Sequence, residues 1–313
     1  MDNFIFCLNA TMPIFFTMLL GVLFQRVGLF DDGFVNKLNK FVFNAALPAL
    51  LFNDISTVDF REVWDGRMVA FCFSVTLLSI CISTAVSYLF DRKIQGEFIQ
   101  GSYRSSSAIL GIAFMQNLYG TSKIAPLMVI ASVPLYNVMA VVVLSLFKPD
   151  REKFSGALIK KTLSGILHNP IILGIAVGVL WSVLRLPQPV ILEKTTANLG
   201  VLATPLGLMA MGGSIRLKQA FSSPVPTVIC TAMKLCGYVS LFLPIAVHMG
   251  FREEKLVAML VMLGSSTTVS CFIMAKNMGH EGQFSSGIIM MTTLFSAVTL
   301  TAELFLLKSM GLI

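Results

Sequence analysis

Two stretches of the sequence place runs of small polar residues inside otherwise apolar segments. One run contains Ser105, Ser106, Ser107 and Gly111, and the other contains Ser265, Ser266, Thr267, Thr268 and Ser270. Hydroxyl groups can bind backbone groups that lose their partners where a helix is interrupted. The half-helix ends at an interruption carry partial charges that can hold an anion or a polar group. The two runs therefore predict a binding site where two interrupted helices cross, unless the hydroxyls only allow close helix packing.

Three further polar residues lie in apolar surroundings. Lys234 is well inside an apolar stretch, where a charge is costly and should face a cavity, a partner or the substrate. We expect Lys234 to carry charge for the site or to act as a coupling group. Alternatively, it reaches cytoplasmic water or binds a carbonyl of an interrupted helix. Asn44 and Asn137 are candidate substrate contacts, or else hydrogen-bonding residues between helices.

The composition indicates whether the chain is surrounded by water or by lipid. The chain has 313 residues, of which 56% are hydrophobic and only 12% are charged, and its mean hydropathy is +0.82. Soluble proteins are about a quarter charged, so an all-α polytopic membrane protein is expected. The net charge of +7 is spread over short loops, which argues against a nucleic-acid partner. Because no catalytic, nucleotide-binding or metal-ligand pattern is present, we expect neither an enzyme nor a cofactor or metal.

Ten stretches are long and apolar enough to cross a bilayer. They cover residues 5–25, 35–54, 67–90, 98–119, 123–147, 166–186, 191–213, 224–248, 255–278 and 284–307. Lysines and arginines are more frequent in the loops that would be cytoplasmic if the N-terminus lies outside. The sequence thus predicts a multi-pass protein of the cell membrane, with both termini extracytoplasmic.

The two halves of the chain resemble each other. Pro13 and Pro48 align without a gap with Pro170 and Pro205, and Ser105 to Ser107 align with Ser265 to Thr267. We therefore predict a first repeat over 1–150, a cytoplasmic connector over 151–165 and a second repeat over 166–313. Because each repeat would hold five helices, an odd number, the second must be inverted, as in many secondary transporters. Membrane helices are built from few apolar residue types, which alone could explain the matches among leucine, isoleucine and valine.

Several short motifs resemble those of the auxin efflux carrier family, the PIN-like transporters. They are Leu47-Pro48-Ala49-Leu50-Leu51-Phe52, Leu110-Gly111-Ile112, the region from Lys234 to Pro244, and Phe272-Ile273-Met274-Ala275-Lys276. The resemblance implies a scaffold domain over 5–54 and 166–213, often dimeric, and a transport domain over 67–147 and 224–307. Elevator-like movement and small organic anions such as auxin or dicarboxylates are further implications. The chain departs from the family pattern because Ala113 and Ser266 replace prolines, and Ser106 and Ser270 replace asparagines.

Three functions are compatible with these features. A secondary transporter of a small organic anion is favoured by the paired polar runs and Lys234. A sodium- or proton-coupled antiporter of related fold would need an acid beside the crossing, and segments 98–119 and 255–278 offer none there. A membrane sensor or scaffold would bind a ligand without transporting it.

Overall fold

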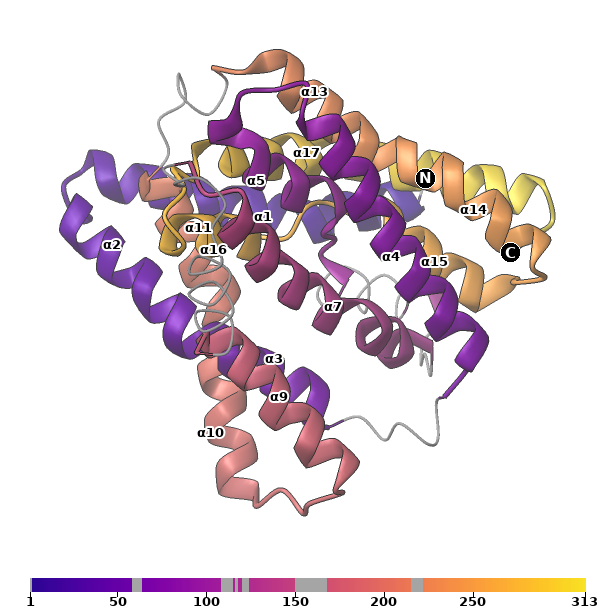
Figure 1. Cartoon of the computed structure of the whole chain (residues 1–313), viewed down its shortest axis with the longest axis horizontal. Helices are drawn as coiled ribbons and strands as arrows, with labels where there is room; N and C mark the ends of the chain where they lie inside the picture. The colour runs from indigo at the N-terminus through magenta and orange to yellow at the C-terminus, as the bar shows by residue number, and fades with distance from the viewer. Residues whose placement is uncertain are drawn as a thin grey trace.

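The computed structural model describes residues 2–57, 64–107, 115, 118–119, 124–149, 168–214 and 222–313. All regular elements in this part of the chain are helices, and it also contains one isolated β-bridge (Figure 1). Its elements are α1 (Asp2–Arg26), α2 (Asp32–Phe41), the π-helix η1 (Val42–Ala46), α3 (Leu47–Ser56), α4 (Gly66–Ser87), α5 (Arg92–Tyr103), α7 (Ile124–Leu146), α9 (Pro170–Val183), α10 (Val190–Val201), α11 (Ala203–Ser214), α13 (Pro224–Ala232), the π-helix η3 (Met233–Gly237), α14 (Tyr238–His248), α15 (Glu253–Gly264), α16 (Ser270–Asn277) and α17 (Gln283–Ser309). The predicted all-α class is confirmed.

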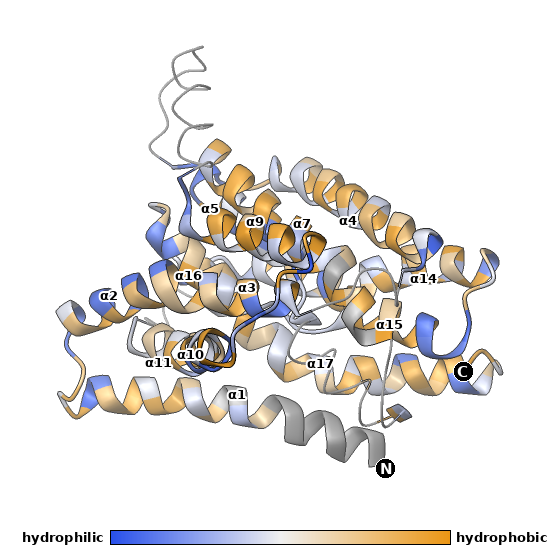
Figure 2. Ribbon diagram, turned by 90° about the horizontal axis from the view of Figure 1, so that it is seen from below, coloured by the Kyte–Doolittle hydropathy of each residue, from blue (hydrophilic) through white to orange (hydrophobic). Residues whose placement is uncertain are grey.

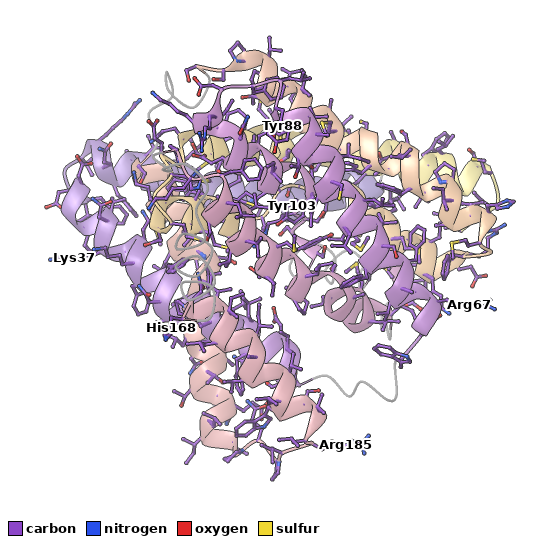
Figure 3. The ribbon with its side chains drawn as sticks, in the orientation of Figure 1. Lys37, Arg67, Tyr88, Tyr103, His168 and Arg185 are labelled. Carbon is purple, nitrogen blue, oxygen red and sulfur yellow. The ribbon has the colours of Figure 1, made fainter. Side chains whose placement is uncertain are left out.

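The outer surface of the helices is apolar, as a membrane requires. Within the described residues, four helical stretches are long and apolar enough to span a bilayer: Gly66–Ser87, Leu127–Leu146, Pro224–His248 and Gln283–Ser309. Leu23, Leu180 and Phe305 are among the large apolar side chains exposed on α1, α9 and α17. Figure 2 shows hydrophilic residues mainly at helix ends and turns, and Figure 3 shows the side chains of Lys37, Arg67 and Arg185 at the periphery. The number of ten spans and the inverted repeat stay predictions.

The helices pack in two groups. In the first, α1 packs on α11, and α3 packs on α9 and α10; α3, α9 and α10 lie together at one end of the molecule (Figure 1). In the second, α4, α5, α7 and α13 to α17 pack mainly among themselves, and α1 touches this group through α17. The division into scaffold and transport domains stays a prediction.

The contact between α1 and α11 depends on two glycines. A Cβ atom at Gly212 would lie 2.1 Å from the backbone oxygen of Met18, and one at Gly21 would lie 2.2 Å from that of Met209. Small residues of this kind let two membrane helices approach until their backbones touch. No side chain can be added there unless the helices separate.

We therefore expect Gly212→Ala to destabilise the protein by about 1–3 kcal/mol, the usual range for overpacking a well-packed contact. The melting temperature of the purified protein in detergent should fall by several degrees. Gly237→Ala is the matched control, because a Cβ there would meet no atom closer than 3.6 Å. Equal melting temperatures for the two variants would contradict the close packing of α1 on α11.

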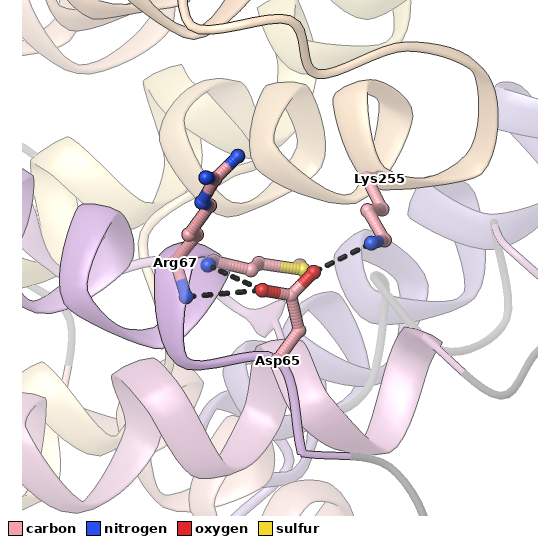
Figure 4. Close-up of polar contacts among 4 residues, drawn as sticks. Asp65, Arg67 and Lys255 are labelled. Carbon is pink, nitrogen blue, oxygen red and sulfur yellow. Dashed lines mark hydrogen bonds and ion pairs between the residues drawn. The ribbon is translucent and has the colours of Figure 1, made fainter.

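The start of α4 is joined to the start of α15 by one carboxylate (Figure 4). Asp65 caps α4 by accepting from the backbone N–H groups of Arg67 and Met68 at 3.0 and 3.1 Å. Its other oxygen lies 2.5 Å from the Nζ atom of Lys255. The hydrogen bond from Lys255 is the main cause that lowers the pKa of Asp65, so the contribution to stability is present at neutral pH and is lost as the pH falls through that lowered pKa. Because both side chains are partly exposed to solvent, the contribution of the pair is small.

Candidate functional site

Two helix interruptions meet in the interior of the protein. Helix α5 ends at Tyr103, and helix α15 ends at Gly264 with α16 beginning at Ser270. The extended residues after α5 and those between α15 and α16 form an antiparallel bridge between Ser105 and Thr267. Across it, the N–H of Ser106 donates to the carbonyl oxygen of Ser266 at 3.0 Å. The predicted interruption is therefore present in the second segment, between α15 and α16. In the first segment α5 ends at the predicted place and its end touches that interruption, and the chain beyond residue 107 lies mostly outside the described residues.

The hydroxyls of the second run satisfy the backbone at this crossing. Thr267 Oγ1 donates to the carbonyl oxygen of Gly101 at 2.8 Å, and Thr267 N donates to Thr292 Oγ1 of α17 at 3.0 Å. These bonds replace partners that an uninterrupted helix would have supplied, which a lipid environment makes obligatory. Helix α17 thereby holds the crossing from a third side.

Lys234 caps the carbonyl end of α15. Its side chain is fully buried, and Nζ donates to the carbonyl oxygen of Leu263 and to Ser105 Oγ. Ser105 Oγ in turn donates to the carbonyl oxygen of Met262. The last carbonyls of a helix form its negative pole, where a cation is stabilising. Of the alternatives left open by the sequence, the bond to a carbonyl of an interrupted helix is therefore the one observed.

A cavity of about 60 Å³ lies beside the crossing. A water molecule needs roughly 10–15 Å³ of such space, so the cavity suits a solute of a few heavy atoms. Its walls come from α3, α7, α11, α16, α17 and both segments of the crossing. They consist of Leu47, Leu50, Leu51, Asp54, Arg104, Ser105, Ser106, Val133, Tyr136, Asn137, Ala203, Thr204, Ser266, Thr267, Thr268, Val269, Ser270, Ile273 and Thr293. Leucine and valine side chains therefore close a space whose polar groups are mostly hydroxyls.

Arg104 supplies a positive charge to this cavity. It is the first residue after α5, has extended backbone, and is only 1% exposed. Its Nη2 atom donates to Asn137 Oδ1 at 2.8 Å, and Nη1 approaches Gln100 Oε1 at 3.4 Å and Met274 Sδ at 3.0 Å. Nε is buried without a partner among the described residues. All of these acceptors are neutral, so the hydrogen bonds orient the guanidinium without cancelling its charge.

The neighbours of Arg104 fix its position. Gln100 Nε2 donates to the carbonyl oxygen of Cys271 at 2.9 Å, which joins α5 to α16. Tyr103, which lies in the interior in Figure 3, packs against Tyr136 with ring centroids 5.9 Å apart. The guanidinium is thus held between α5, α7 and α16, where its planar group of donors can face the cavity.

Asp54 brings a negative charge to the same cavity. It lies near the end of α3, and its Oδ2 atom is buried without a hydrogen-bond partner among the described residues. Segments 98–119 and 255–278 hold no acid, but the expectation that none lies beside the crossing is wrong. Asp54 comes from segment 35–54, and the packing of α3 brings it to the cavity.

The predicted site residues divide into three sets. Those that line the cavity are Ser105, Ser106, Ser266, Thr267, Thr268, Ser270 and Asn137. Ser107 and Ser265 have buried hydroxyls without a partner in the described part of the chain, and they do not line the cavity. Asn44 donates to the carbonyl oxygen of Lys40 at 2.7 Å within its own helix and is exposed, while Gly111 lies outside the described residues. Substrate contact by any of them stays a prediction.

Arg104 was not predicted, although the sequence carries a signal for it. It stands inside the predicted span 98–119, between Tyr103 and the first serine of the polar run. An ionisable residue within a membrane segment is by default a candidate for a functional site. A count of basic residues in the loops alone passes over it.

Comparison with known proteins gives concordant results. The family described as "Membrane transport protein" matches residues 6–303 of the chain. A similar protein from Rhizobium meliloti (strain 1021), named "Putative malonate transporter", is 23% identical over 308 residues, which is 96% of each chain. The resemblance to the auxin efflux carriers is confirmed at the level of the family. The chain belongs to this family of membrane transport proteins.

Proposed function

We propose that the protein is a secondary transporter of small carboxylates, which bind in the cavity at the crossing. The observation that carries the proposal is Arg104, a buried guanidinium whose hydrogen-bond partners in the described part of the chain are all neutral. A buried charge is costly unless another charge pairs with it. A carboxylate substrate would complete the pairing, and a planar guanidinium suits a carboxylate group.

The helix ends at the crossing favour an anion for a second reason. The negative end of α15 is covered by Lys234, whereas α16 begins at Ser270 on the cavity wall. The positive pole of α16 therefore faces the substrate space, and its polarity supports an anionic guest. The hydroxyls of Ser106, Thr268 and Ser270 would bind further carboxylate oxygens or a second carboxylate.

A short dicarboxylate is our first choice of substrate. The relative named as a malonate transporter supports this class, and the small cavity supports a short molecule. We further propose an elevator-type mechanism in which the group containing α4, α5, α7 and α13 to α17 moves against the group containing α3, α9 and α10, with a homodimer formed through the latter. A cell-membrane location with both termini extracytoplasmic completes the proposal.

Counterflow in proteoliposomes tests the proposal. Vesicles containing the purified protein and loaded with unlabelled malonate should accumulate labelled malonate, whereas vesicles loaded with malonamide should not, because the diamide lacks negative charge. Acetate, succinate and an aromatic carboxylate would define the size limit.

Binding measured on the same preparation separates transport from sensing. Binding of malonate without counterflow would favour a membrane sensor instead. Neither binding nor counterflow of any carboxylate by well-folded protein would refute the proposed function.

A further inference from the structure

The cavity at the crossing contains one group that anion binding alone does not explain. Asp54 and Arg104 are its two charged side chains in the described part of the chain, and they lie on different packing groups. They form no ion pair within 4 Å, and the Oδ2 atom of Asp54 is enclosed without a partner there. An acid in this position is unfavourable for a site that receives an anion, so its presence needs a reason.

Within the described residues, the surroundings of Asp54 offer no other compensating charge. Helix α9, which packs most closely on α3, has no titratable residue between Pro170 and Val183, and η1 has none either. Helix α10 carries Glu193 and Lys194, whose side chains are exposed. Across the cavity, Tyr136 directs its hydroxyl toward the carbonyl oxygen of Met262 at 3.4 Å. In the part of the chain that the structure describes, Arg104 is thus the cation that Asp54 and an incoming anion would share.

A carboxylate and a bound anion cannot both stay charged at low cost in one small cavity. Two like charges in a shared site repel, and the repulsion is relieved when one of them takes up a proton. We propose that Asp54 takes up a proton when an anionic substrate binds beside Arg104, so that substrate and proton enter the cavity together. This inference rests on the proposed function and adds a coupling ion to it. The proton comes from the water on the side of entry and leaves with the anion on the other side.

The sign of the pH dependence follows from this linkage. Because the anion-bound state holds one proton more than the empty state, anion affinity should rise as the pH falls. Where Asp54 of the empty protein is ionised, one linked proton changes affinity about tenfold per pH unit. If Asp54 cannot ionise, the affinity should be high and independent of pH.

Malonate binding by calorimetry, from about pH 6.5 to about 8.5, provides the test. The malonate affinity of the wild-type protein should fall about tenfold for each unit by which the pH rises. Asp54→Asn should bind malonate at every pH as tightly as the wild type does at the acidic end. Glu193→Gln is the matched control, because it makes the same change at an exposed acid on the adjacent helix, and it should behave as wild type. A flat profile for wild type, or the same slope in Asp54→Asn, would overturn the inference.

Proton movement in wild-type vesicles keeps the inference testable even if Asp54→Asn fails to fold. Entry of malonate should acidify the lumen, as reported by a trapped pH-sensitive dye, and sodium should be dispensable. Malonate entry with no proton, or with an obligatory sodium ion, would overturn this inference and leave the proposed function standing. Absence of anion binding or flux altogether would instead refute the proposed function, and this inference with it.

Discussion

Replacing Arg104 by glutamine is expected to abolish malonate counterflow and to weaken malonate binding by about 100-fold or more. Each hydrogen bond between a charged donor and a carboxylate contributes about 1.5–3 kcal/mol, and a guanidinium can form two of them. Glutamine is polar but shorter than arginine and uncharged, so the substitution removes the bond from Nη2 to Asn137 together with the charge. Counterflow and calorimetry on the same preparation would measure both effects.

Two further variants make the test of Arg104 specific. Arg67→Gln removes a charge from an exposed arginine at the start of α4, away from the cavity, and should transport as wild type. Arg104→Lys keeps the charge but loses the planar pair of donors, so it should retain weak binding. Counterflow by Arg104→Gln at the wild-type rate would remove Arg104 from the substrate site.

The crossing could be predicted because lipid makes its requirements severe. An interrupted backbone in a bilayer must find new hydrogen-bond partners, and serine and threonine are the small residues that supply them. Thr267 does this directly by binding Gly101 and Thr292. The run from Ser265 to Thr267 occupies the same position in the second half as the run from Ser105 to Ser107 does in the first. This equivalence indicated which two segments would meet. Sequence and fold agree here because the same local requirement, hydroxyl partners for a backbone that has left the helix, applies in both halves of the chain.

The charges of the site could not be assigned in the same way, because they depend on tertiary packing. The sequence is compatible with Lys234 either as a coupling residue or as a helix cap, and the bond to Leu263 that makes it a cap depends on tertiary packing. A coupling role for Lys234 stays a prediction. Asp54 lies near the end of an apolar segment, and the packing of α3 on α9 and α10 places it on the cavity wall. Asn44 turned out to bind its own helix at Lys40, the common alternative for an intramembrane asparagine. Periodicity and composition carry no information about these distances.

Replacing Ser270 by phenylalanine is expected to eliminate malonate counterflow while leaving expression and the melting temperature close to those of wild type. Ser270 lines the cavity at the first turn of α16, and its hydroxyl contacts Thr268 Oγ1 at 3.4 Å. A phenyl ring there would occupy much of a space of only about 60 Å³ and would cover the positive end of the helix. Ser106→Phe should have the same effect from the opposite interruption.

The matched control for the phenylalanine variants is Ser74→Phe, which makes the same change at an exposed position of α4, away from the cavity. It should leave counterflow intact, because added apolar area is tolerated where the solvent is hydrocarbon. Overpacking inside the protein costs about 1–3 kcal/mol unless the ring enters empty space, so a stable but inactive Ser270→Phe protein would place the ring in the cavity. Malonate counterflow by both Ser270→Phe and Ser106→Phe at the rate of Ser74→Phe would show that the substrate passes elsewhere.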